Sequence, residues 1–469
     1  MKIANTCGAL ILLVGMSFAQ KEAPLPPDLP PYGPEKPLQA PAVNTTRLDN
    51  GLTVWLVSEP GFPKVAFQVA VRGGLAADSP DRPGISELLA KTIDQGTKTR
   101  NAKQIAQELQ AAGGDLNAAT EKDDTEISTS VLSSRIETGV NLLADILQNA
   151  SFPDAEVTLA KRNLADSLQQ QESEPSFLAA RAMAKVLFGD HPYHVAAPTP
   201  ESIAAATPAD LRKIYGQRFR PDQCIMVVVG DFEDARMMEL VKSKLGAWKA
   251  PNESPLEAPD NASATPEHAV YVVPRPGSVQ TTLRLGSFGP LRGAPDYEAA
   301  EVANAIYGGT FSSRLTSNIR EDKGYTYTPF SFLRPYRRAA VLTTGADVRN
   351  EVTGPTLNEI MYEMNRLATT SPSEEELTKT KRYLVGSEAI NLQARSAVAQ
   401  ELATLWVDNL PPDYIGTYGQ KISAATKDDV DSAARKYFPF AHTVVVAVGE
   451  ENVVRDAMAP FGMAVHTAP

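Results

Sequence analysis

The sequence predicts an α+β protein made of two homologous domains, each an antiparallel-rich sheet covered by helices. Three observations lead to this fold class: an internal repeat, runs of alternating apolar residues, and segments of helical period. The chain has 469 residues, 43% of them hydrophobic, enough for two to four domains of about 100–200 residues each. Two such domains facing each other would form half of a clamshell chamber, but the sequence alone equally allows two domains that touch through a small interface.

The internal repeat is clearest where a helix leads into a Val-rich strand. The segment "TPADLRKIYGQRFRPDQCIMVVVGDFE" begins at Thr207, and "TKDDVDSAARKYFPFAHTVVVAVGEEN" begins at Thr426. Each starts with a threonine suited to a helix N-cap. Earlier in the two halves, "KVAFQVAVRGG" and "TTLRLGSFG" alternate with the period of two of half-buried strands. The repeat predicts an N-terminal domain over residues 44–256, a polar linker over 257–264 and a C-terminal domain over 265–469.

The beginning of the chain predicts export. Residues 1–19 combine a lysine, an apolar run and the small-x-small sequence "SFA", which is typical of a secretory signal peptide. Residues 20–43 are rich in proline and predict an extended tether. We expect a periplasmic or secreted protein with no membrane insertion after signal cleavage. Cleavage would leave Cys224 as the sole cysteine, and its apolar surroundings predict an inert buried thiol.

Charge and histidine content narrow the possible functions. The net charge is −11 and no block of lysine and arginine is present, which argues against binding to nucleic acid or to an anionic membrane surface. We expect proteins, peptides or small molecules as partners. No two histidines are four residues apart, as a metal-binding helix would require; the five are His191, His194, His268, His442 and His466.

The stretch "GISELLAKTIDQGT", Gly84 to Thr97, predicts one amphipathic helix with a Gly-Thr stop. With the two-domain repeat, it resembles the insulinase/pitrilysin-like zinc peptidase family, which includes mitochondrial processing peptidase. That family carries the pattern Gly-x-x-His-x-x-Glu-His-x-x-x-x-Gly-Thr, whose frame is kept here as Gly84, Gly96 and Thr97. The resemblance covers nearly the whole mature chain.

In this sequence, other residues occupy the zinc-binding positions of that pattern. In the family, two histidines four residues apart bind zinc and the glutamate between them acts as general base. Their positions hold Glu87, Ala90 and Lys91, and the third ligand, a glutamate, falls at Ser167. An ammonium group has no lone pair and alanine cannot accept a proton, so we expect no metal and no cofactor in this chain.

The altered helix has its own interpretation. Glu87 and Lys91 have the spacing of a helical ion pair, worth about 0.2–0.5 kcal/mol when exposed. They therefore suggest that a helix which binds the metal in the family now has only a structural role here. The alternative is that Lys91 binds the C-terminal carboxylate of a peptide.

The second conspicuous stretch is "YGGTFSSRLTSNIREDKGYTYTPFSF", Tyr307 to Phe332. It predicts a helix ended by Gly324 and then a strand with Tyr325 and Tyr327 on one face. By themselves an arginine and tyrosines in such places are usually structural. Members of the family carry an arginine on this helix and a tyrosine seven residues later, and Arg320 and Tyr327 match both.

The resemblance implies that Arg320 and Tyr327 bind substrate and stabilise the oxyanion of peptide hydrolysis. Arg314 or Tyr325 is an alternative donor. Our hypothesis is a non-zinc-binding subunit of an exported heterodimeric zinc metallopeptidase, inactive alone. Its partner would be a homologous subunit with an intact H-x-x-E-H motif that holds the zinc, and its substrates would be extended peptides. The alternative function is an inactive peptidase-fold protein that acts in peptide binding or complex assembly.

Overall fold

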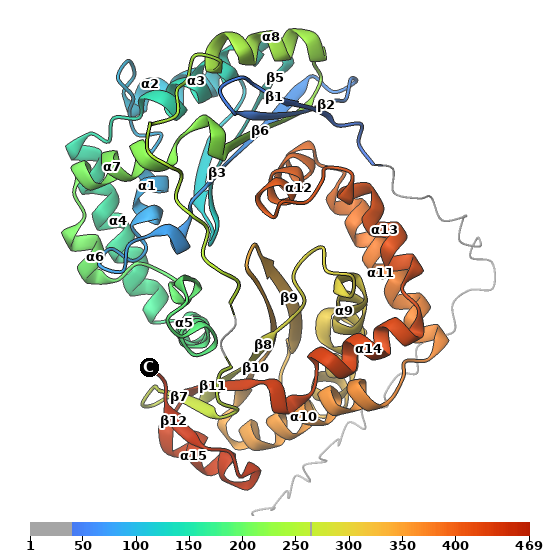
Figure 1. Ribbon diagram of the computed structural model, residues 1–469. Helices are drawn as coiled ribbons and strands as arrows, with labels where there is room; N and C mark the ends of the chain where they lie inside the picture. The colour runs from blue at the N-terminus through green and yellow to red at the C-terminus, as the bar shows by residue number, and fades with distance from the viewer. Residues whose placement is uncertain (1–39, 263–264) are drawn as a thin grey trace, which may run out of the picture. The chain divides into compact units, whose positions relative to one another are not determined.

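The computed structural model describes residues 40–262 and 265–469, which belong to one compact unit of residues 38–469 (Figure 1). The expected signal peptide over 1–19 and the tether up to residue 39 lie outside the described residues. The described part contains two six-stranded sheets, one in each half of the chain, with helices around them. The predicted α+β class with two homologous domains is confirmed. Among the described helices, none is long and apolar enough to cross a bilayer.

The N-terminal sheet is mainly antiparallel. Only the β2–β6 pair is parallel, and β4 forms one edge of the sheet. The central strands β3 and β6 are buried along nearly their whole length, since both sheet faces are covered. In spatial order the strands are β1 (Asn44–Arg47), β2 (Thr53–Ser58), β6 (Cys224–Gly230), β3 (Lys64–Arg72), β5 (Asp124–Leu132) and β4 (Leu116–Thr120).

The C-terminal sheet repeats the order of the other five strands, and a strand from the end of the chain, β12, takes the place of β1. The β12–β7 and β7–β11 pairs are parallel and the others are antiparallel, so β9 is an edge strand in the same place as β4. In spatial order the strands are β12 (Val465–Thr467), β7 (Val270–Pro274), β11 (Val444–Gly449), β8 (Gln280–Phe288), β10 (Ala339–Arg349) and β9 (Phe330–Tyr336).

The helices begin where the sequence places capping residues. The side chains of Thr207 and Thr426 accept hydrogen bonds from the backbone N–H of Asp210 and Asp429, and both pairs form capping boxes. The N-terminal half contains α1 (Ile85–Thr92), α2 (Ala102–Ala111), α3 (Ile136–Asn149), α4 (Asp154–Glu172), α5 (Pro175–Phe188), α6 (Pro200–Ala205), α7 (Pro208–Arg218) and α8 (Asp234–Leu245). The C-terminal half contains α9 (Tyr297–Asn304), α10 (Thr353–Thr369), α11 (Glu374–Asn391), α12 (Arg395–Val407), α13 (Tyr414–Ala424), α14 (Lys427–Tyr437) and α15 (Glu451–Met458).

The two halves exchange one helix each. Helix α12 of the C-terminal half packs on β3 and β6, where Leu402 joins a buried cluster with Trp55 and Ile225. Helix α5 of the N-terminal half packs on β8 and β11, where Met183 joins a cluster with Val446. Each sheet therefore has one face covered by a helix from the other half, and neither half completes its core alone.

Cys224 is the only cysteine among the described residues, and it belongs to the core of the N-terminal half. Cys224 opens β6, is free, and has no exposed surface. Burial raises the pKa of its thiol well above the usual value. The predicted inert core thiol is confirmed.

We predict that Leu402→Ala lowers the free energy of unfolding by about 2–5 kcal/mol, because it leaves a cavity between α12 and the N-terminal sheet. Urea denaturation followed by tryptophan fluorescence would measure the change, since Trp55 lies in the same cluster. The control is Leu159→Ala on α4, where the side chain is 52% exposed and the change should stay within about 0.5 kcal/mol. Equal losses in both variants would contradict the role given to α12.

Candidate functional site

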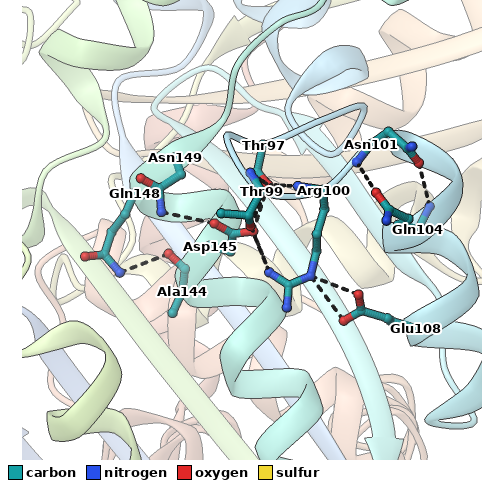
Figure 2. A network of polar contacts seen from close by, with 10 residues as sticks. All are labelled: Thr97, Thr99, Arg100, Asn101, Gln104, Glu108, Ala144, Asp145, Gln148 and Asn149. Atoms are coloured by element: carbon teal, nitrogen blue, oxygen red, sulfur yellow. Dashed lines mark hydrogen bonds and ion pairs between the residues drawn. The ribbon is translucent and has the colours of Figure 1, made fainter.

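Helix α1 is fixed at both ends by special residues. Gly84 precedes it with φ +75°, and a Cβ there would lie 2.3 Å from the Pro198 backbone, so only glycine fits this close approach. The helix ends at Thr92, earlier than the Gly-Thr stop that the sequence suggested. Thr97 instead anchors the following loop through a hydrogen bond from its hydroxyl to Asp145 (Figure 2).

Asp145 is the centre of the network in Figure 2. Its Oδ2 accepts hydrogen bonds from Thr97 at 2.7 Å, Thr99 at 2.8 Å and the Arg100 guanidinium at 2.6 Å. Burial opposes ionisation of this carboxyl group, but these donors hold its pKa below the usual value. The residues around Thr97 therefore attach the loop after α1 to α3.

The three altered positions of α1 line one pocket of about 390 Å³. Its other walls come from α5, from the edge strand β4 and from β9, which contributes Tyr336. Glu87 is half-buried and burial raises its pKa, with Lys91 acting in the opposite direction. Ala90 is buried and Lys91 is exposed. The structure therefore brings Glu87, Ala90 and Lys91 together in the lining of one pocket.

The expected ion pair between Glu87 and Lys91 is not formed. Their charges interact, but no nitrogen–oxygen distance between the two side chains is 4.0 Å or less. The reason is their different surroundings, because Lys91 extends toward solvent while Glu87 is half-buried against the pocket.

These residues do not fit a zinc ion. Zinc sites in proteins use histidine, cysteine and carboxylate donors, whereas Ala90 has no donor atom and Lys91 carries a positive charge. Ser167 is exposed on α4, which packs against α1, and it is not part of the pocket lining. Within residues 40–262 and 265–469, no three His, Cys, Asp or Glu side chains are grouped so that they could hold a metal ion.

The second candidate stretch contains two π-helical turns, η5 (Ala305–Gly309) and η6 (Thr316–Asp322). π-Helical turns are rare and occur frequently at functional sites. Gly324 then adopts φ +62°, and its N–H donates to the Arg320 carbonyl at 3.2 Å. The predicted glycine stop after this helix is confirmed, although the helix is of π rather than α type.

Arg320 and Tyr327 lie against each other on the surface. The guanidinium carbon of Arg320 is 4.4 Å from the centre of the Tyr327 ring and 4.6 Å from that of Phe311, so cation–π contacts hold it between two aromatic rings. Its Nε also lies 3.1 Å from the Glu321 carboxylate. Tyr327 is 78% exposed and Phe311 is 69% exposed. The Tyr327 and Phe311 rings are therefore exposed, and the Arg320 guanidinium between them is half-buried.

Phe311 was missed by the sequence reasoning. The sequence feature that could have identified Phe311 is a large apolar residue between "GGT" and "SSR", in a segment rich in glycine and serine. Exposed aromatic residues beside a charged group are typical of binding surfaces.

The predicted strand over Tyr325 and Tyr327 is wrong. Strand β9 begins only at Phe330, and Tyr325 packs against the C-terminal core while Tyr327 points to solvent. Pro329 explains the late start, because it lacks an N–H for sheet pairing and restricts the residue before it. The segment is held instead by Thr326, whose hydroxyl donates to the Asp347 carbonyl at 2.8 Å.

Arg314 and Tyr325 do not join the exposed pair. Arg314 is buried and donates two hydrogen bonds to the Glu376 carboxylate, at 2.8 and 2.9 Å. This bidentate pair fixes the residues just before η6 to α11. Arg314 therefore has a structural partner, and of the two tyrosines only Tyr327 contacts Arg320.

The fold and these two stretches define a metallopeptidase-like protein whose own metal-binding helix lacks zinc donors. Comparison with family profiles agrees. Residues 53–199 match the profile described as "Insulinase (Peptidase family M16)", and residues 205–384 match "Peptidase M16 inactive domain". The chain belongs to peptidase family M16.

Curated relatives and solved structures extend this similarity. The Bacillus subtilis (strain 168) protein named "Uncharacterized zinc protease YmxG" is 27% identical over 74% of this chain and 84% of its own length. A crystal structure of a peptidase M16 inactive domain from Pseudomonas fluorescens has a TM-score of 0.82 at 25% identity, covering 87% of this chain and 98% of its own. A protease from Helicobacter pylori has a TM-score of 0.82 at 21% identity, covering 87% and 100%, and shows the same fold.

We predict that the purified chain retains less than about 0.1 zinc per molecule after incubation with zinc chloride and desalting, because the α1 positions offer no zinc donor set. The combined substitutions Glu87→His, Ala90→Glu and Lys91→His should raise zinc retention at least about tenfold. Elemental analysis by mass spectrometry measures both samples. Lys98→His, an exposed position beyond α1, is the control for a nonspecific effect of added histidine. Stoichiometric zinc in the unmodified chain would contradict this account of α1.

Proposed function

We propose that this chain is the non-zinc-binding subunit of an exported heterodimeric metallopeptidase of family M16. Its partner is a homologous subunit with an intact H-x-x-E-H motif, and its substrates are extended peptides. The observation that carries the proposal is the contact between Arg320 and the exposed Tyr327, in a family fold whose α1 lacks a set of zinc ligands. The signal-peptide pattern of residues 1–19 supports export.

The chemistry of peptide hydrolysis gives this pair a role. Negative charge develops on the carbonyl oxygen as water attacks, and donors aimed at that oxygen stabilise it. The partner's zinc would polarise that carbonyl group and activate the water. The rings of Tyr327 and Phe311 hold the Arg320 guanidinium, which leaves hydrogen-bond donors at its edge. The Tyr327 hydroxyl is a second donor.

Substrate binding in this proposal uses sheet edges. Strands β4 and β9 are the outer strands of their sheets, so each offers unpaired N–H and C=O groups to an added peptide strand. Strand β9 begins three residues after Tyr327, which places an edge next to the exposed pair. Such backbone pairing makes few demands on substrate sequence.

The test is a peptidase assay on this chain, on its partner candidate and on their mixture. We predict cleavage only in the mixture. Arg320→Ala and Tyr327→Phe should each lower kcat by about 10²–10³, the usual effect of removing one oxyanion donor. The controls are Arg349→Ala and Tyr362→Phe, whose side chains are exposed elsewhere in the C-terminal half.

Assembly must be measured on the same samples by size-exclusion chromatography, so that lost activity is not confused with lost dimer. Cleavage by this chain alone would contradict a zinc-less subunit. An active mixture that is unaffected by either substitution would contradict the role of the pair. Peptide binding without cleavage in any sample would favour the alternative function in binding or assembly.

A further inference from the structure

A small cavity of about 40 Å³ lies where the two halves of the chain meet their linker. Its walls come from the loop after β3, the turn between β4 and β5, the end of α7, linker residues 256–259 and the turn between β9 and β10. Five cationic side chains line it, against two acidic ones, Asp123 and Glu257. The cationic residues are Arg72, Lys122, Arg218, Arg220 and Arg337.

Two of the five cations are neutralised by carboxylates of their own. Arg218 pairs with Asp78 at 3.0 Å, and both side chains are buried. Arg220 pairs with Asp222 at 2.6 Å. These two ion pairs form part of the cavity wall. The other three cations are Arg72, Lys122 and Arg337.

The other three cations have no carboxylate within 4.0 Å among the described residues. Arg72 donates from Nη2 only to neutral groups, the Trp406 carbonyl at 2.7 Å and the Asn409 side chain at 2.6 Å. The Lys122 ammonium likewise donates to two backbone carbonyls. The Arg337 guanidinium makes no hydrogen bond or ion pair to the described part of the chain, and its Nε and that of Arg72 are buried without an acceptor.

The two acidic side chains of the lining offset these three positive charges only in part. Asp123 is a single carboxylate among them, and it accepts hydrogen bonds from the Tyr193 hydroxyl at 2.5 Å and from the Arg337 backbone N–H at 3.0 Å. Glu257 is exposed on the linker. Burial, followed by the neighbouring Glu126, raises the pKa of Asp124 well above its usual range.

Burial, with a smaller contribution from neighbouring cations, lowers the pKa of two of these cations. Burial and the neighbouring Arg337 lower the pKa of Arg72 to about 10. Burial, followed by Arg334, lowers the pKa of Lys122 to about 8. Both directions indicate a partly dehydrated region of positive potential, in which a bound anion is stabilised.

We propose that this cavity is a binding site for a small oxyanion of the size of phosphate or sulfate. Arginine and lysine are the preferred protein partners of such groups. The volume favours an anion of this size, because one water needs about 10–15 Å³ of such space. An anion held by Arg72, Lys122 and Arg337 would tie the N-terminal half of the chain to the C-terminal half. This proposal is independent of the peptidase role.

The experiment is titration calorimetry of the full mature chain with sodium phosphate and sodium sulfate, at constant ionic strength set by chloride. We expect saturable binding of one phosphate or sulfate, with a matching rise in melting temperature that added chloride does not produce. ATP serves as the probe for a phosphate group carried by a larger ligand, and it should bind more weakly than phosphate.

Arg337→Gln is the decisive variant, because its guanidinium makes no hydrogen bond or ion pair to the described part of the chain. We expect its Kd for phosphate to rise at least about tenfold, the loss of one charge-assisted hydrogen bond. Arg349→Gln, exposed and distant in the fold, should leave Kd unchanged. No saturable binding, tighter binding of ATP, or an unchanged Kd in Arg337→Gln would each overturn the proposal.

Discussion

The exchange of α5 and α12 between the two halves is the packing constraint on which the rest of the structure depends. Each sheet has two apolar faces, and the second face of each is closed by a helix that belongs to the other half. Burial of this kind is worth about 25 cal/mol per Å² of apolar surface. It joins two domains of one repeat into a single unit and fixes where their edge strands and connecting loops lie.

Much of the fold could be predicted from the sequence, because the features that determine it are patterns of residues close together in the chain. The repeat, the strand alternation and the Thr207 and Thr426 caps all depend on neighbours a few residues apart. The exchange of α5 and α12 could not be predicted, since the apolar face of a helix does not indicate which sheet that helix covers. The strand expected at Tyr327 does not form, because Pro329 cannot donate to a sheet and restricts the residue before it; β9 begins only at Phe330.

The site was predicted in part. Glu87, Ala90 and Lys91 do line one pocket, but the ion pair expected from their spacing does not form. The sequence singled out Arg320 and Tyr327 through a family resemblance, whereas the contact that holds them also involves Phe311, which the resemblance did not mark. Cation–π contacts depend on ring orientation, which residue spacing does not encode. The charged cavity could not be predicted from residue spacing either, because its cations come from distant parts of the chain.

The central claim is that Arg320 and Tyr327 act on a substrate whose zinc is held by another subunit. The most direct measurement is a structure of the heterodimer with a bound peptide and its metal. The account predicts that the Arg320 guanidinium and the Tyr327 hydroxyl lie within about 3.2 Å of the position of the carbonyl oxygen of the scissile bond. A complex in which both groups remain out of reach of that oxygen, while the partner cleaves the peptide, would contradict it.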